Sequence, residues 1–241
     1  MMEKIKIAHL YYDLMNLYGE HGNILGLAKA LENHGVKVIT HYYTISDEIP
    51  FEDYDLFYIG SGNEESFELV RKDIRSKKES IQKCFDNNQF FLITGNALNL
   101  FGKTYTHLDE KTSETLGILN YESCETDFRI VGEQVYTNDS PHEIIGFENR
   151  SSVLKNVEET SLFHVKQGTG YAPNKLEEGI QKNHFYGTYL LGPMMIRNPY
   201  FKEELIKELL KSKDIPYEEK IDSFELKAYE EYQKNLLHEE N

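Results

Sequence analysis

Short apolar runs alternate with segments of helical periodicity over the first 105 residues, and this alternation constrains the fold most. Four runs are typical of buried strands: residues 5–10, 36–43, 55–60 and 90–94. Between them, apolar residues recur at intervals of three and four, which predicts helices over residues 23–33 and 64–85. The order strand, helix, strand, strand, helix, strand indicates a mostly parallel sheet with helices on its faces.

The pattern changes from residue 116 onward. Five short strand-like segments, separated by turn residues, cover residues 116–122, 128–137, 142–149, 161–165 and 187–193. We expect them to form a β-rich second half built onto the same sheet. Residues 200–241 return to helical periodicity and predict a C-terminal helical tail. Because no linker divides the chain, we expect residues 1–241 to form a single domain.

The composition narrows the classes of protein to which this chain can belong. Hydrophobic residues are 39% and charged residues 28% of the 241, which is ordinary for a soluble globular protein. No apolar run approaches the roughly 18 residues of a membrane span. The N-terminus reaches Asp13 too soon for a signal peptide, so we expect a cytoplasmic protein without membrane insertion. The formal charge of −15 argues against nucleic-acid binding, because it repels phosphate backbones.

The two cysteines give no sign of a metal site, a disulfide or a nucleophile. Cys84 and Cys124 lack the spacing of metal ligands. Cys84 follows a helical pattern, and we expect it to be a half-buried helix residue. Cys124 lies among polar residues with nothing nearby to lower the pKa of its thiol, so we expect it at the surface. We predict no metal and no cofactor.

Two glycine-containing turns follow predicted strands and are candidates for a site. The first is Gly60-Ser61-Gly62. The second lies in FLITGNALNLFGK, residues 91–103, where a buried strand passes through Thr-Gly-Asn (residues 94–96) into a helix. Sites in parallel sheets form at the carboxyl ends of strands. A strand–turn–helix of this kind is also where many enzymes carry a nucleophile, but the turn offers neither Cys nor Ser.

Six motifs in order carry a resemblance to a known family. They are DLMNLYGEHGNILGL, YIGSGNEE, LITGNALNLFGK, LGIL, IIGFEN and YGTYLLGP. Over roughly residues 5–220 the chain resembles the class I glutamine amidotransferases, and within them the cobyric-acid-synthase-like branch. The resemblance implies an α/β fold, a flavodoxin-like three-layer sandwich with a mostly parallel central sheet.

The resemblance also implies a reaction and a partner. Members of the family hydrolyse glutamine with a cysteine thiolate, a histidine that moves protons, and backbone N–H groups that hold the oxyanion. The branch member that this chain resembles most forms a heterodimer with a Mur-ligase-type subunit. That ATP-dependent subunit amidates the D-glutamate carboxyl of the peptidoglycan precursor lipid II.

The residues that the family uses for catalysis are missing. Aligning the turn on the Gly-Lys that closes residues 91–103 puts the family cysteine at Gly95, and a slip of one residue puts it at Thr94. A threonine hydroxyl needs an adjacent base to become a nucleophile. The family histidine falls at Leu191, within GTYLLGP, and a leucine cannot move a proton. His184 could replace it, although an ordinary surface or core histidine is the simpler interpretation.

Five positions are predicted to form a binding pocket even so. The resemblance places the oxyanion turn at Gly60, Ser61 and Gly62, beside Asn96, and a carboxylate-binding arginine at Arg129. The pocket could therefore hold a small amino acid or carboxylate that it does not cleave.

Three functions remain open at this point. The first is an amidotransferase-like subunit that cannot hydrolyse glutamine, a pseudoenzyme paired with a Mur-ligase-type protein. The second is an active glutaminase that uses Thr94 or a residue of the partner. The third is a stand-alone amino-acid-binding protein. We also expect Gly95→Cys and Leu191→His together to bring a thiol and an imidazole within reach of each other.

Overall fold

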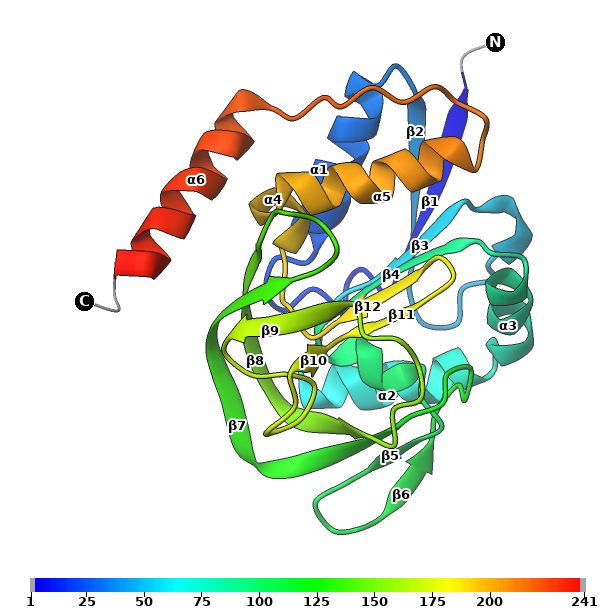
Figure 1. Cartoon of the computed structure of the whole chain (residues 1–241). Helices are drawn as coiled ribbons and strands as arrows, with labels where there is room; N and C mark the ends of the chain where they lie inside the picture. Colours follow the sequence, from blue (N-terminus) through cyan, green and yellow to red (C-terminus); the bar gives the residue numbers. More distant parts are fainter. Residues whose placement is uncertain (1–2, 239–241) are drawn as a thin grey trace.

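The computed structural model describes residues 3–238 and contains a central sheet of six strands (Figure 1). Five strands are parallel, and the edge strand β11 runs antiparallel to its neighbour β12. In spatial order the strands are β11 (Ile180–Lys182), β12 (Phe185–Thr188), β4 (Phe90–Thr94), β3 (Leu56–Ile59), β1 (Lys4–Leu10) and β2 (Lys37–Tyr43). The predicted mostly parallel sheet is confirmed.

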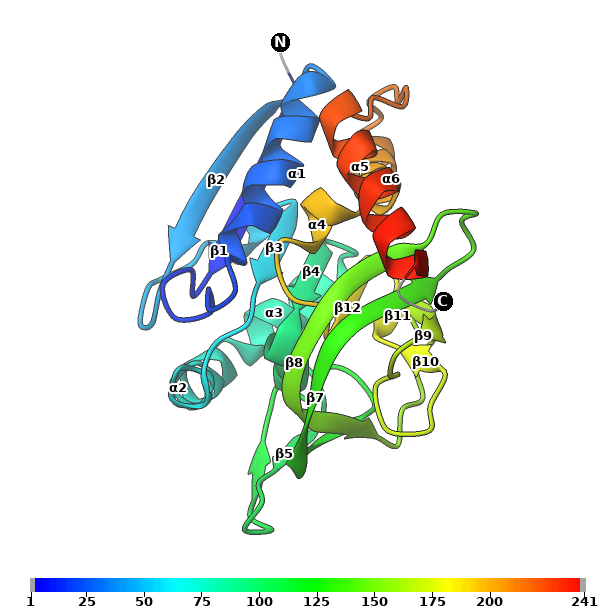
Figure 2. The same ribbon diagram turned by 90° about the vertical axis from the view of Figure 1, so that its left-hand side faces the viewer.

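Helices cover both faces of this sheet and complete the predicted three layers (Figures 1 and 2). One face carries α1 (His21–Asn33), α4 (Met194–Arg197) and α5 (Pro199–Lys211), and the other carries α2 (Glu64–Arg75) and α3 (Lys78–Asp86). The side chains of β4 alternate between two hydrophobic cores, with Phe90 and Leu92 on the α1 side and Phe91 and Ile93 on the α2 side. Burial on both faces explains why this strand reads as a continuous apolar run.

The second half builds a separate sheet, which corrects the expectation of one shared sheet. Only β11 and β12 join the central sheet. A long, curved ribbon of two antiparallel strands dominates the second sheet (Figure 2). The strands of this sheet are β5 (Thr104–Thr106), β6 (Thr112–Glu114), β7 (Glu122–Thr137), β8 (Ile144–Lys155), β9 (Phe163–Gln167) and β10 (Glu177–Glu178).

Two predicted elements differ in detail. The helix predicted over residues 64–85 is two helices, because the Ser76 hydroxyl donates to the carbonyl of Asp73 and ends α2. Residues 116–121 form no strand, since Gly117 has a φ of +63° that breaks an extended run. Their backbone amides instead donate to carbonyls of residues 100–102, just after the turn at Gly95. These hydrogen bonds therefore hold the end of the turn that begins at Gly95.

The predicted C-terminal tail contains α5 and a last helix, α6 (Ser223–His238), with residues 212–222 between them. Tyr229 of α6 is buried against Val135 and Ile145 of the long ribbon. Lys202 of α5, itself buried, forms an ion pair with Glu225. Residues 239–241 lie outside the described part of the chain, and the single domain over residues 1–241 stays a prediction.

Candidate functional site

Loops at the carboxyl edge of the central sheet bring distant residues together. Because β1, β3, β4 and β12 are parallel, the segments that follow them leave the sheet at the same edge. These segments carry Glu20, the turn Gly60–Gly62, the 3₁₀ turn Gly95–Leu100 and Leu191. The sequence-predicted residues at these turns are thus neighbours in space.

Gly95 has a left-handed backbone, with a φ of +60°. Thr94 before it is extended, so the chain turns sharply at Gly95. A Cβ atom built on Gly95 would lie 2.5 Å from Cβ and 2.6 Å from Oγ of Ser61. The space into which a side chain at position 95 would point is therefore filled by Ser61. A glycine fits both the backbone conformation and the missing space.

Leu191 lies beside the same space. Its Cδ2 atom would be 3.1 Å from a Cβ on Gly95, and the backbone N–H of Gly95 donates to the carbonyl of Leu190 at 3.2 Å. Positions 95 and 191 are thus close enough for their side chains to touch. His184 lies at the opposite end of β12, where it stacks on Phe90 and bonds to the carbonyl of Asn88, so it has no access to this place.

The backbone amides that could hold an oxyanion already have acceptors. The N–H of Gly62 donates to Oδ1 of Asn96 at 3.0 Å, and Nδ2 of Asn96 donates back to the Gly62 carbonyl at 2.7 Å. The N–H of Asn96 donates to Oγ of Ser61 at 3.4 Å, and that hydroxyl donates to Oδ1 of Asn96 at 3.2 Å. Side chains of the site itself therefore use the hydrogen bonds that an oxyanion would need.

A buried carboxyl group, which the sequence reasoning did not identify, ties the loops of this edge together. Glu20 is 0% exposed. Its Oε2 accepts hydrogen bonds from the hydroxyls of Thr94 at 2.7 Å and Tyr58 at 2.8 Å, and its Oε1 accepts from the N–H of Gly192 at 3.0 Å. Gly60 lies against the same side chain, since a Cβ there would be 2.5 Å from Cβ of Glu20. Gly60 therefore allows the close packing of Glu20 against the turn, and it does not line the pocket described below.

Burial raises the pKa of Glu20 above its ordinary value, although the hydrogen bonds from Gly192, Thr94, Tyr58 and the backbone of Ser61 oppose that shift. With these donors around it and no exposure to solvent, Glu20 serves as a structural hydrogen-bond acceptor at this edge. Thr94 is itself 0% exposed, with its hydroxyl directed to Glu20. In this geometry Thr94 has no access to a substrate.

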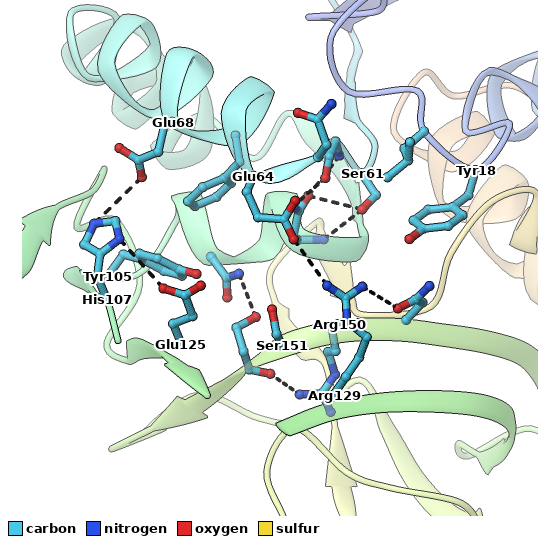
Figure 3. A pocket seen from close by; sticks show the side chains of 18 residues that line it. Tyr18, Ser61, Glu64, Glu68, Tyr105, His107, Glu125, Arg129, Arg150 and Ser151 are labelled. Atoms are coloured by element: carbon cyan, nitrogen blue, oxygen red, sulfur yellow. Dashed lines mark hydrogen bonds and ion pairs between the residues drawn. The ribbon is translucent and has the colours of Figure 1, made fainter. Parts of the chain in front are cut away.

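A pocket opens next to Asn96, between α2 and the long ribbon (Figure 3). Its volume is about 180 Å³. Four of the five predicted binding residues line it: Ser61, Gly62, Asn96 and Arg129. The guanidinium of Arg129, which is half-exposed, donates to Asn149 at 2.9 Å and to the carboxylate of Glu64 at 3.3 Å. A dashed line in Figure 3 marks this link from the ribbon to α2.

A buried charged cluster supports the floor of the pocket. Arg150 of β8 forms an ion pair with Glu148 at 2.7 Å and stacks on the ring of Tyr189 at 4.0 Å. Glu178 accepts hydrogen bonds from Thr188 and from the N–H of Tyr189. Burial, together with the nearby charge of Glu148, raises the pKa of Glu178 to about 8. The cluster fixes residues 188–189, just before Leu191.

Other kinds of site are not found in the described residues. Within residues 3–238, no three side chains among His, Cys, Asp and Glu are grouped so as to hold a metal ion. Over the same range, none of the helices has the length and apolar character needed to cross a membrane. Cys84 is buried on α3, and burial raises the pKa of its thiol to about 11, whereas Cys124 is partly exposed on β7.

The chain is similar to proteins of a known family. Residues 6–199 match the family described as the CobB/CobQ-like glutamine amidotransferase domain. The chain belongs to this family. The resemblance inferred from six sequence motifs is confirmed, together with the fold class that it implied.

Two relatives are similar to this CobB/CobQ-like chain over most of their length. The chain is 30% identical over 213 residues to the lipid II isoglutaminyl synthase (glutamine-hydrolyzing) subunit GatD of Streptococcus pneumoniae (strain ATCC BAA-255 / R6), covering 87% of this chain and 82% of that protein. It is 29% identical over 219 residues to GatD of Staphylococcus aureus (strain N315), covering 91% and 90%.

Solved structures show the same fold at low identity. A glutamine amidotransferase crystal structure matches with a TM-score of 0.53 and 13% identity, covering 83% of this chain and 98% of the other. The glutaminase domain of the Trypanosoma brucei CTPS, with bound acivicin, matches with a TM-score of 0.51 and 11% identity, covering 91% and 98%. This CobB/CobQ-like chain therefore has an amidotransferase fold around a site whose chemistry must be judged from its own residues.

Proposed function

We propose that this chain is the amidotransferase-like subunit of a two-subunit enzyme that amidates lipid II, and that it does not itself hydrolyse glutamine. In this proposal it forms a heterodimer in the cytoplasm with a Mur-ligase-type, ATP-dependent partner, which amidates the D-glutamate carboxyl. The similarity to two GatD subunits over most of their length supports the pathway. The partner then takes its nitrogen from free ammonia or from another donor.

One observation carries the loss of hydrolysis. The two positions that would hold the thiol and the imidazole, Gly95 and Leu191, are neighbours, since a Cβ on Gly95 would lie 3.1 Å from Cδ2 of Leu191, yet they offer a hydrogen atom and an isobutyl group. Neither group can attack an amide carbon or transfer a proton. The occupied backbone amides of Gly62 and Asn96 support the same conclusion, because they cannot stabilise a tetrahedral oxyanion without first breaking existing bonds.

The alternative of a glutaminase that uses Thr94 has less support. Its side chain is 0% exposed, and its hydroxyl donates to Glu20 in the interior. A hydroxyl that a substrate cannot reach cannot act as a nucleophile. A nucleophile supplied by the partner is the remaining form of this alternative, and the same assay addresses it.

The test is an ammonia-release assay with glutamine on the chain alone and on the chain with its Mur-ligase-type partner. We expect no release above background in either case, and we expect amidation of lipid II when ammonium is supplied. Thr94→Ala and wild type should behave alike. Release of ammonia from glutamine that disappears in Thr94→Ala would establish the alternative. Release that persists in Thr94→Ala would point to a residue of the partner.

Association with the ligase needs a separate experiment. We expect the two proteins to co-elute from a size-exclusion column when expressed together. If the chain elutes alone and binds a small amino acid without any ligase present, the stand-alone binding protein becomes the better description.

A further inference from the structure

The side chain of Asn96 is a primary carboxamide, the same group that ends the side chain of glutamine. Its oxygen accepts from the N–H of Gly62 at 3.0 Å and from the hydroxyl of Ser61 at 3.2 Å. Its nitrogen donates to the carbonyl of Gly62 at 2.7 Å. The paired bonds to the N–H and the C=O of one residue fix both ends of the amide in the turn that follows β3.

This arrangement places a carboxamide of the chain where a substrate carboxamide would be polarised. An amide carbonyl is activated when preorganised N–H donors point at its oxygen. Here the Gly62 donor points at the oxygen of Asn96, one residue after the position that would carry the nucleophile. The amide carbon of Asn96 has no thiol beside it, because residue 95 is glycine. The group can therefore stay in this place without being cleaved.

We propose that Asn96 is an internal substitute for the substrate amide and that it makes the pocket exclude glutamine. This inference rests on the proposed non-hydrolytic function and deepens it, since it names the residue that decides which ligands enter. A free glutamine would have to displace a group that is covalently held at the site, and such a group acts at a very high effective concentration. The rest of the pocket still contains Arg129, whose guanidinium would have to exchange Glu64 for the carboxylate of a ligand.

Asn96 is suited to this role by its position as well as by its chemistry. It is only partly buried and lines the pocket, so its removal opens space that is continuous with the cavity of about 180 Å³. Its neighbour Asn99 also carries a carboxamide, but that group bonds to Tyr189 and Ser152 in the core. Of these two amides, only that of Asn96 holds the backbone of Gly62.

The test compares binding of L-glutamine by wild type and Asn96→Ala with isothermal titration calorimetry. We expect Asn96→Ala to bind L-glutamine at least about tenfold more tightly. L-Norvaline, which has the same α-carboxylate and α-amine but no carboxamide, should gain nothing. Adding Arg129→Ala to Asn96→Ala should abolish the gain, because the carboxylate then loses its partner.

Asn149→Ala is the matched control, since Asn149 lines the same pocket but contacts Arg129 instead of Gly62. It should show no gain for L-glutamine. Thermal unfolding checks that each variant is folded, and Asn96→Ser, which is too short to span both groups of Gly62, provides a second way to free the donor. Three results would each overturn the inference: equal binding of glutamine by wild type and both Asn96 variants, an equal gain for norvaline, or an equal gain in Asn149→Ala. None of them would alter the ammonia-release result on wild type.

Discussion

A single methyl group added at residue 95 tests the geometry on which the proposed loss of hydrolysis depends. Gly95→Ala would bring its new Cβ to 2.5 Å from Cβ and 2.6 Å from Oγ of Ser61. Carbon atoms that are not bonded pack at about 3.5–4.0 Å, so the turn that carries Ser61 must move. The φ of +60° adds a second penalty, since a side chain is strained in a left-handed backbone.

The two penalties can be separated with a control in the same chain. Overpacking costs about 1–3 kcal/mol and left-handed strain about 1–2 kcal/mol, so Gly95→Ala should lower the free energy of unfolding by about 2–5 kcal/mol. Gly19 has a φ of +73°, and a Cβ added there would meet nothing within 4 Å. Gly19→Ala should therefore show only the strain. For a chain of this size each kcal/mol shifts Tm by about 2–4 °C.

Thermal and urea unfolding followed by circular dichroism measure these differences. Combining Gly95→Ala with Ser61→Gly should recover the overpacking part, so that the two changes are strongly non-additive. Equal destabilisation by Gly95→Ala and Gly19→Ala would mean that Ser61 does not fill the space beside residue 95. The absence of any recovery with Ser61→Gly would mean the same.

The close approach of Ser61 to residue 95 also changes what we expect of the double variant Gly95→Cys with Leu191→His. Gly95→Cys with Leu191→His brings the two groups within reach, but the cysteine Cβ meets Ser61 and the N–H of Gly62 stays bound to Asn96. We therefore expect this double variant to release no ammonia from glutamine. Adding Ser61→Gly and Asn96→Gly removes both obstacles, and any glutaminase activity should first be detected in that quadruple variant.

Three further predictions concern buried titratable groups. The pKa of Glu178 is about 8 in the folded chain and 4.5 ordinarily, so between these pH values the folded chain holds a proton that the unfolded chain has released. The free energy of unfolding should therefore fall from about pH 4.5 to about pH 8, by up to about 1.4 kcal/mol per pH unit. Urea titrations should show that Glu178→Gln removes this slope. Burial, with the nearby His21, lowers the pKa of His9 from 6.5 to about 3, so its contribution is complete above pH 6.5 and is lost as the pH falls toward 3; His9→Phe should flatten that acid limb. Arg150→Met leaves Glu148 as a buried carboxylate without its ion-pair partner and should cost about 3–5 kcal/mol in urea unfolding, whereas adding Glu148→Leu should recover most of it.

The central sheet could be predicted because its strands are buried on both faces and its helices have one apolar stripe. These patterns are local, so the sequence of β4 or of α2 predicts its secondary structure without knowledge of the elements that pack against it. The separate second sheet was missed for the opposite reason. The alternation along β7 and β8 predicts strands but does not say which strand each one pairs with, and here they pair with each other.

The sequence predicted which residues lie together at this edge but not the hydrogen bonds among them, and their role in binding stays a prediction. The motifs predicted that Gly95, Leu191 and the Gly60–Gly62 turn lie together, and they do so at the carboxyl edge of the central sheet. Nothing in the sequence indicates that Glu20 is buried, because an acidic residue just before a helix is usually read as a favourable charge at the helix N-terminus. Likewise, Asn96 could be placed at the pocket, but the direction of its side chain depends on the backbone of a turn 34 residues away in sequence.

The bonds of Glu20 explain how this edge keeps its shape whichever side chains stand at positions 95 and 191. A catalytic site that is held only by its reacting groups would lose its geometry when those groups are removed. Here one carboxyl, from the loop before α1, accepts hydrogen bonds from Thr94 after β4, from Tyr58 on β3 and from Gly192 after β12. None of these bonds involves residue 95 or the side chain of Leu191. The loops are therefore fixed by groups other than residue 95 and the side chain of Leu191, and the surface that they form does not depend on those two side chains.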